Sequence, residues 1–249
     1  MFEASETLKF LNYYNPELVI YGGTFDPPHF GHLECVDCAA NRFPRAKFIV
    51  APTPKPPQIA GIEKLPFLSF EFRVQLLKKI FARRNSTNTI EFSSAETELP
   101  PPNYTVNLLS EFHRRYDGKK LGFLMGQDQI MVFNQWFNPQ KIFDLASLVV
   151  VQRYKQKENQ KEFRQVLVTT FEKINMKIVW VDDSSALIYD GSDSVKPKSA
   201  IFMIEKIVCE ASSTEIKQFL EDKKAIPKDW LSADLVEMIQ DYTHKVRVG

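Results

Sequence analysis

Short apolar segments alternate with amphipathic segments along most of the chain, and this alternation limits the possible folds more than any other feature. Runs rich in β-branched and aromatic residues predict strands at 17–22, 46–52, 88–93, 121–126, 147–153 and 177–183. Between them, apolar residues recur every three or four positions and predict helices at 32–43, 70–84, 104–116 and 157–174. Short buried strands joined by crossover helices form parallel sheets, so the predicted fold is α/β, a doubly wound parallel sheet with helices on both faces.

Several segments are expected to lie outside this sheet, at the two ends of the chain and in loops. Residues 211–249 predict a C-terminal helical segment of two helices, separated by a turn at Pro227, with Ser232 capping the second. Residues 1–17 are expected to be an N-terminal extension of a single domain at 18–249. The Pro-rich segment 51–61 and the polar segment 182–200 predict long surface loops of the kind that form active-site lids. No role follows for residues 1–16 or for 182–200.

Composition excludes several classes of partner. The 249 residues are 44% hydrophobic, which is enough for a substantial core, and 32 basic residues nearly balance 31 acidic ones. This balance gives no general attraction to nucleic acid or to an anionic membrane. The N-terminus lacks a signal-peptide pattern, no apolar run approaches the roughly 20 residues that span a bilayer, and three cysteines make no disulfide framework. We therefore expect a cytoplasmic protein; its oligomeric state is not indicated.

The stretch "GGTFDPPHFGHLEC" (22–35) directly follows the first predicted strand and holds two of the four histidines of the chain. In doubly wound sheets, ligands bind beyond the carboxyl ends of the strands, where the strand order reverses. Gly22 and Gly23 allow a close approach of the backbone, and a helix starting near Gly31 directs N–H groups and its positive dipole end there. His29 and His32 add ring donors. The stretch therefore predicts a site for phosphate groups and phosphoryl transfer.

A zinc site is the alternative for this stretch, because it places two histidines and two cysteines at regular spacing: His29, His32, Cys35 and Cys38. On one continuous helix these four side chains rotate around the axis and span about 14 Å, which is too far for one tetrahedral ion. We therefore predict no protein-held metal. The cysteines are expected to pack in the core near the sheet, with Val36, Ala39 and Phe43.

The segment "GGTFDPPHFGHL" resembles the signature of the H-x-G-H nucleotidyltransferase superfamily, and in particular that of the bacterial nicotinate mononucleotide adenylyltransferases. Three further segments resemble motifs of that family in the same order. "PPNYTVNLL" (101–109) is similar to SYT-V-D-T-L, residues 125–153 resemble G-x-D…W…I…L…V-x-R, and "ASSTEIK" (211–217) resembles ISST-x-I-R. The resemblance covers about residues 18–243 and implies a Rossmann-like fold. The G-x-D…W segment is not expected in the phosphopantetheine or glycerol-phosphate branches.

This resemblance implies adenylyl transfer from ATP to nicotinate mononucleotide, giving nicotinate adenine dinucleotide and pyrophosphate, in NAD biosynthesis. The implied catalytic residues are His29, His32 and Lys217. The implied ATP-binding residues are Gly22, Gly23, Thr24, Phe25, Gly31, Gly126, Asp128, Ser212, Ser213 and Thr214. The implied acceptor-binding residues are Tyr104, Thr105, Trp136 and Lys55. Mg²⁺ is expected to arrive with ATP rather than in a site of the protein.

Five positions depart from the family pattern: Lys217 replaces an arginine, Gln58 and Ile59 replace the histidine and lysine of PPHK, and Asn107 and Leu108 replace Asp and Thr. Lys55 precedes the changed PPHK segment and can supply its missing charge. Two alternatives remain open at this point. One is another adenylyl- or cytidylyltransferase of the superfamily, with nicotinamide mononucleotide or phosphopantetheine as acceptor. The other is a catalytically weakened nucleotide-binding protein, which Lys217 and Gln58 would suit.

Overall fold

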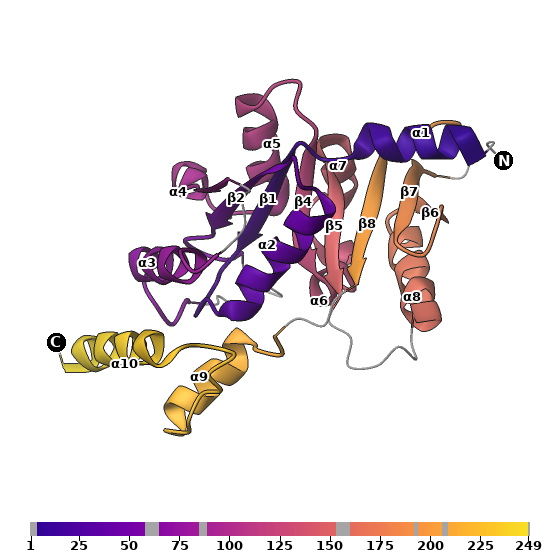
Figure 1. The fold of residues 1–249 in the computed structure, drawn as a ribbon. Coiled ribbons are helices and arrows are strands. Elements are labelled where there is room, and N and C mark those ends of the chain that lie inside the picture. The colour runs from indigo at the N-terminus through magenta and orange to yellow at the C-terminus, as the bar shows by residue number, and fades with distance from the viewer. Residues whose placement is uncertain are drawn as a thin grey trace.

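A single mixed sheet forms the centre of the molecule (Figure 1). The structure, a computed structural model, describes residues 4–57, 65–84, 89–152, 160–191, 194–205 and 209–248. Eight strands of this part of the chain form the sheet, in the order β3-β2-β1-β4-β5-β8-β7-β6. They are β1 (Leu18–Gly23), β2 (Lys47–Pro52), β3 (Ile90–Phe92), β4 (Leu121–Gly126), β5 (Ala146–Gln152), β6 (Met176–Trp180), β7 (Ser185–Asp190) and β8 (Ser199–Glu205).

Helices cover both faces of the sheet, as the sequence predicts. The predicted helices are α2 (Phe30–Arg42), α3 (Phe70–Phe81), α5 (Thr105–Arg115), α8 (Gln160–Glu172), α9 (Ser213–Glu221) and α10 (Ala233–Val248), which begins directly after Ser232. The helices without a sequence prediction are α1 (Ala4–Tyr14), α4 (Ala95–Glu98), α6 (Gln127–Ile130), the 3-10 helix η1 (Phe133–Gln135) and α7 (Pro139–Leu145). Among the described residues, no helix combines the length and the apolarity needed to span a bilayer.

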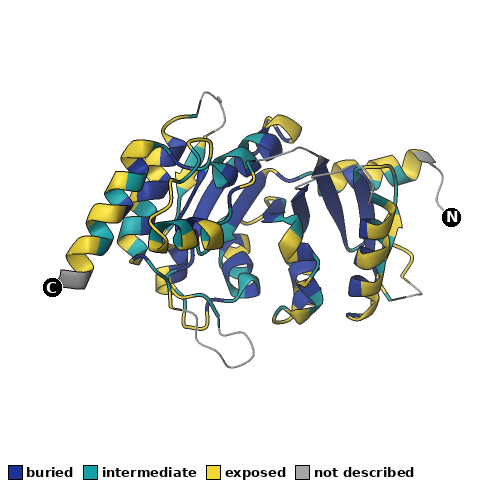
Figure 2. Ribbon diagram, turned by 90° about the horizontal axis from the view of Figure 1, so that it is seen from below, coloured by how far each residue is buried: buried dark blue, intermediate teal, exposed yellow. Residues whose placement is uncertain are grey.

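Two apolar cores lie on opposite faces of the sheet, because successive side chains of a strand point to opposite sides. Within β1, Val19 and Tyr21 join the core under α2, α3, α9 and α10, whereas Leu18 and Ile20 join the core under α5, α7 and α8. Figure 2 shows the buried strands between two layers of helices whose outer faces are exposed. The doubly wound arrangement is therefore confirmed. The first core also contains the residues expected there: Cys35, Val36, Cys38, Ala39 and Phe43.

The prediction of a surface loop at 182–200 is wrong, because this segment contains β7 and the start of β8. Strand β7 is antiparallel to both of its neighbours, β6 and β8, so the sheet is not purely parallel. Its centre, Ala186–Ile188, is fully buried. Its apolar run, residues 186–189, is only four residues long and polar residues flank it on both sides. The sequence pattern is therefore too short to predict a strand.

Helix α1 lies across the strand ends that are farthest from α9 and α10 (Figure 1). It contacts β7 and β8, and the Ser147 hydroxyl donates a hydrogen bond to the Tyr14 carbonyl at 2.9 Å. Pro16 packs at the start of β4, where a Cβ on Gly122 would lie 2.8 Å from the proline ring. The extension is thus packed against the domain, away from the carboxyl ends of the parallel strands.

The strand order reverses between β1 and β4. From β1 the chain continues to β2 and β3 on one side, and β4 leads to β5 on the other. Such a reversal opens a crevice beyond the carboxyl ends of the two strands, which is where doubly wound proteins bind ligands. Gly23 ends β1 and Gly126 ends β4, so the segments after these glycines form the expected site.

Candidate active site

The turn from β1 to α2 is held in an unusual backbone conformation. Phe25 has φ = 50°, a left-handed value that costs a residue other than glycine roughly 1–2 kcal/mol. Its ring is buried and contacts the rings of Tyr21 and His32 edge to face, with centroids 5.1 and 5.0 Å away. Such aromatic contacts offset the backbone cost, so the shape of the turn depends on tertiary packing.

The two histidines lie side by side at the start of α2. Their ring centroids are 3.8 Å apart, and the His29 backbone N–H donates a hydrogen bond to His32 Nδ1 at 3.1 Å. Since Nδ1 accepts this bond, Nε2 is the nitrogen of the His32 ring that can act as a donor toward a ligand. His29 is only 1% exposed, whereas His32 is half-buried. His32 is therefore the more accessible of the two.

The C-terminal part of the chain covers the first turn of α2. The Phe30 N–H donates to the Trp230 carbonyl at 3.0 Å, so this N–H is already bonded within the protein. A Cβ on Gly31 would lie 3.0 Å from the His29 ring and 3.3 Å from the Cys209 carbonyl. The glycine is thus required by packing between α2 and the segment around Cys209, which was not evident from the sequence.

Helix α9 brings the ASSTEIK segment to the same place. Ser212 is its N-cap and accepts from the Glu215 N–H at 3.1 Å, and the Ser213 hydroxyl donates to the Pro27 carbonyl at 2.9 Å. Two hydroxyls predicted to contact phosphate are therefore used within the protein. The donors that α9 presents to a ligand are the backbone N–H groups of its first residues and the exposed Thr214.

A cavity of about 170 Å³ lies where the turn after β1 meets α9. Its lining residues are Thr24, Phe25, Asp26, Pro56, Leu65, Pro66, Ser213, Thr214 and Lys217. The Lys217 ammonium is 3.5 Å from Asp26 Oδ2, and its side chain remains 23% exposed. The structure thus assembles predicted site residues from both ends of the chain. An ammonium group and the N-terminus of α9 give this cavity donors and positive potential suited to an anion.

Asp26 and Arg73 are site residues that the sequence reasoning missed. Asp26 is buried and accepts hydrogen bonds from the N–H groups of Phe67 and Leu68 at 2.7 and 2.9 Å. Arg73 is fully buried in α3 and donates only to backbone carbonyls. Its acceptors are the carbonyls of Thr24, Thr53, Pro54 and Leu68. Both side chains therefore tie together the loops that line the cavity.

A signal for Arg73 was present in the sequence. Arg73 precedes Leu76 by three residues and Leu77 by four, so it occupies a position on the buried stripe of the helix. An arginine at such a position must satisfy its donors inside the protein. Asp26 had no comparable signal, because it lies within a turn, where an aspartate is common.

Three of the four predicted acceptor-binding residues lie after β3 and β4. Tyr104 is the N-cap of α5 and stacks on the exposed Phe137 ring, with centroids 4.4 Å apart. Trp136 is half-buried and meets the Phe123 ring edge to face at 6.0 Å. Thr105 begins α5 and is also half-buried. These residues present aromatic surface beside a helix N-terminus, which suits a flat ring bearing an anionic group.

Asp128, Gly126 and Lys55 are three further predicted site residues. Asp128 is exposed on α6, and a Cβ on Gly126 would lie 2.5 Å from its Oδ1, so the glycine leaves room for this carboxylate. Lys55 is exposed between Pro54, which binds Arg73, and Pro56, which lines the cavity. Gln58 and the arginine of the V-x-R segment lie outside the described residues.

A buried carboxylate, Glu96, lies between the loop after β2 and the predicted acceptor site. It is 4% exposed, and burial raises its pKa to about 7, against a hydrogen bond from Thr53. Its Oε2 has no hydrogen-bond partner among the described residues, and its backbone carbonyl accepts from Asn103 Nδ2 at 2.7 Å. Asn103 directly precedes Tyr104, so the short helix α4 supports the acceptor loop.

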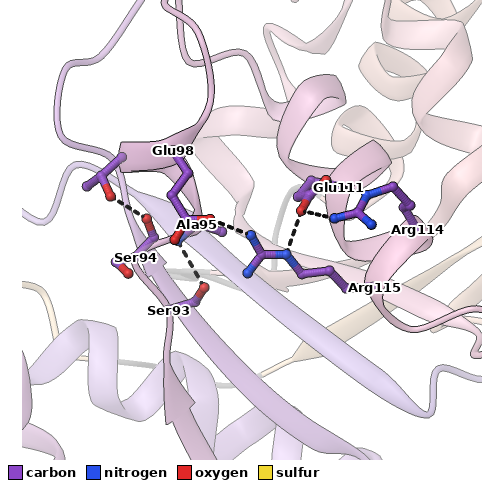
Figure 3. A network of polar contacts seen from close by, with 8 residues as sticks. Ser93, Ser94, Ala95, Glu98, Glu111, Arg114 and Arg115 are labelled. Carbon is purple, nitrogen blue, oxygen red and sulfur yellow. Dashed lines mark hydrogen bonds and ion pairs between the residues drawn. The ribbon is translucent and has the colours of Figure 1, made fainter.

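An ion-pair network on the surface also joins α4 to α5. Arg115 of α5 lies between Glu98 of α4 and Glu111, at 2.8 and 2.6 Å (Figure 3). Hydrogen bonds from Arg114 and Arg115 lower the pKa of Glu111 to about 2. Exposed pairs of this kind contribute little stability each, so this network adds only weakly to the buried contacts between α4 and α5.

The sheet order, the glycine-rich turn at the strand reversal and the anion-suited cavity together define a doubly wound α/β protein with a ligand crevice of the kind that suits phosphate groups. The chain belongs to the cytidylyltransferase-like family, whose model matches residues 20–219.

Two bacterial relatives show how far the similarity extends along the chain. A Klebsiella pneumoniae protein named "Probable nicotinate-nucleotide adenylyltransferase" is 35% identical over 137 residues, which cover 54% of this chain and 59% of that protein. The chain thus matches about three fifths of the length of that relative. A Legionella pneumophila protein of the same name is 26% identical over 228 residues, covering 92% of this chain and 96% of the relative.

Solved structures show the same fold. The nicotinic acid mononucleotide adenylyltransferase of Plasmodium falciparum, complexed with APC, matches with a TM-score of 0.61 and 17% identity, covering 93% of this chain and 96% of that one. Its complex with NaAD matches with a TM-score of 0.59 and 18% identity, covering 92% and 95%.

Proposed function

We propose that this protein is a nucleotidyltransferase that transfers the adenylyl group of ATP to nicotinate mononucleotide. The observation that carries the proposal is the cavity in which Thr24 and Phe25 meet Ser213, Thr214 and Lys217. Its lining residues come from the turn after β1, the segments around Pro56 and Pro66 and the start of α9, and the Phe25 ring also contacts the His32 ring. The names of relatives that align over nearly the whole chain support the choice of reaction.

The proposed reaction is an in-line displacement at the α-phosphorus of ATP. A 5′-phosphate oxygen of the mononucleotide forms the new bond, the bond from the α-phosphorus to the bridging oxygen breaks, and pyrophosphate leaves with that electron pair. The nucleophile is already an anion at neutral pH, so no general base is needed. The rate then depends on positioning and charge stabilisation, as in other phosphoryl-transfer sites.

In this scheme the protein supplies donors along the triphosphate. His32 donates to a phosphate oxygen from Nε2, and the buried His29 packs against the His32 ring. Lys217 and the N-terminus of α9 face the leaving pyrophosphate. Mg²⁺ enters with ATP as part of the substrate and keeps most of its ligands from phosphate oxygens and water. Asp128, exposed after β4, is assigned to the ribose of ATP.

The acceptor is assigned to the part of the site that contains Tyr104 and Trp136. Trp136 stacks on the pyridine ring, and N–H groups at the start of α5, near Tyr104 and Thr105, bind the nicotinate carboxylate with support from the helix dipole. Donors of this kind match a carboxylate but conflict with the NH₂ of an amide. Nicotinate mononucleotide is therefore the proposed acceptor rather than nicotinamide mononucleotide.

The test is to incubate the purified protein with ATP, Mg²⁺ and a panel of phosphate acceptors and to measure pyrophosphate release. Nicotinate mononucleotide should give the highest kcat/KM, with nicotinate adenine dinucleotide as the second product. Preference for phosphopantetheine would refute the proposed acceptor. Binding of ATP without turnover of any acceptor would instead indicate a nucleotide-binding protein.

A further inference from the structure

We propose that Arg73 is a positioning residue for the nucleotide phosphates: it holds the peptide group between Thr24 and Phe25 so that the Phe25 N–H faces the bound polyphosphate. This inference rests on the proposed function, because it assigns the phosphates to the cavity at Thr24 and Lys217. Arg73 itself does not line this cavity and acts through the backbone that it binds.

The hydrogen bonds of Arg73 are directed at the loops of the site. Nε donates to the Leu68 carbonyl at 3.1 Å, Nη1 to the carbonyls of Thr24 and Thr53, and Nη2 to the Pro54 carbonyl at 3.1 Å. These acceptors come from the turn after β1, the loop after β2 and the segment before α3. One planar guanidinium thus fixes three separate loops relative to one another.

The orientation of the Phe25 N–H follows from the geometry of the peptide bond. In a trans peptide the C=O and the next N–H point in opposite directions. The Thr24 carbonyl accepts a hydrogen bond from Arg73 and therefore points toward it. The Phe25 N–H, on the other side of the same peptide group, points away from Arg73. Thr24, Phe25 and Asp26 line the cavity, and the positive φ of Phe25 brings successive N–H groups to one side. Such N–H groups form concave sites for anions.

The charge of Arg73 adds to this effect. The acceptors of its hydrogen bonds are backbone carbonyls, and none of the described carboxylates forms an ion pair with it within 4 Å. Asp26, the nearby carboxylate, accepts instead from Phe67, Leu68 and Lys217. Packing alone would be served as well by an apolar residue at this position of α3, since a buried charge is costly. The cation is explained by the four carbonyls that it holds, with the charge of Asp26 nearby offsetting part of the cost of its burial.

The experiment compares Arg73→Met and Arg73→Lys with a matched control, Arg84→Met. Arg84 follows α3, its side chain is also buried (6% exposed), and it forms an ion pair with Asp37 of α2. Each variant is checked for folding by circular dichroism and thermal melting. Binding of inorganic pyrophosphate and of ATP is measured by calorimetry, and KM and kcat are measured for both substrates.

Arg73→Met should weaken pyrophosphate binding by at least about tenfold and raise the KM for ATP by a similar factor, with a smaller change in the KM for the acceptor. Arg73→Lys should restore part of the affinity, since an ammonium keeps the charge but reaches fewer carbonyls. Arg84→Met should lower the melting temperature and leave pyrophosphate affinity within about twofold, as expected for a distant site.

Unchanged pyrophosphate affinity in the folded Arg73 variants would overturn the inference, and so would an equal loss in Arg84→Met. If Arg73→Met does not fold, Arg73→Lys decides the question by the same measurements. Failure of the wild-type protein to bind either pyrophosphate or ATP would refute the proposed function itself. The two failures are therefore distinguishable.

Discussion

Replacing Glu96 with glutamine should stabilise the protein at neutral and alkaline pH. The side chain is 4% exposed, its Oε2 lacks a hydrogen-bond partner among the described residues, and burial raises its pKa to about 7. Ionising this group in the folded protein therefore has a free-energy cost. Glutamine resembles the protonated acid in size and charge, and its oxygen can still accept the hydrogen bond from Thr53.

The magnitude follows from proton linkage. The ordinary pKa of a glutamate carboxyl is 4.5, and that of Glu96 in the folded protein is about 7. A raised carboxyl pKa means that the folded state binds the proton more tightly, so stability falls as the pH rises from about 4.5 through 7. At about 1.4 kcal/mol per pH unit, the loss is under about 1 kcal/mol at pH 5 and approaches about 3 kcal/mol at pH 8.

Urea unfolding at pH 5, 6, 7 and 8 measures this effect. The free energy of unfolding of Glu96→Gln minus that of the wild type should increase with pH, from under about 1 kcal/mol to about 3 kcal/mol. Other titrating groups are common to both proteins and cancel in the difference. Glu98→Gln is the matched control, because Glu98 lies on the same helix but is exposed and paired with Arg115, a contact worth at most about 1 kcal/mol.

Parallel stability curves for the wild type and Glu96→Gln between pH 5 and 8 would refute the argument. That result would mean that Glu96 titrates at the same pH in the folded and unfolded states. A pH-dependent difference in Glu98→Gln as large as that in Glu96→Gln would also contradict the assignment, because it would locate the effect in the ion pairs of Figure 3 rather than at the buried carboxyl.

Three kinetic predictions follow from the proposed reaction. His29→Ala or His32→Ala should lower kcat by about two to three powers of ten with smaller effects on acceptor affinity; a double variant with near-normal turnover would exclude their role. Lys217→Ala should cost about 2 kcal/mol or more of transition-state stabilisation, while Lys217→Arg should be tolerated; equal rates in all three proteins would place Lys217 outside the reaction. Nicotinate mononucleotide should be preferred over its amide by at least about tenfold in kcat/KM, and Trp136→Ala should weaken both acceptors without changing their ratio. Competition kinetics test this, and equal specificity constants would contradict it.

Much of the fold could be predicted because its signals are local. The alternation of apolar runs with helix-period segments located six of the strands and the main helices to within a few residues. The order of the motifs also predicted that Thr24, Phe25, Ser213, Thr214 and Lys217 belong to one site, and the structure brings them together around one cavity. Strand β7 was missed because its short apolar run becomes a strand only by pairing between β6 and β8.

The sequence by itself determined six of the strands, the main helices and the residue types expected at the site, since periodicity and motif order are properties of neighbouring residues. Only the tertiary structure decided which of those residues are covered and which are open. His29 is buried, Arg73 meets carbonyls of three loops, and Glu96 lacks a partner among the described residues for one carboxylate oxygen. Burial, and with it charge state and donor direction, depends on segments far apart in the chain that meet only after folding.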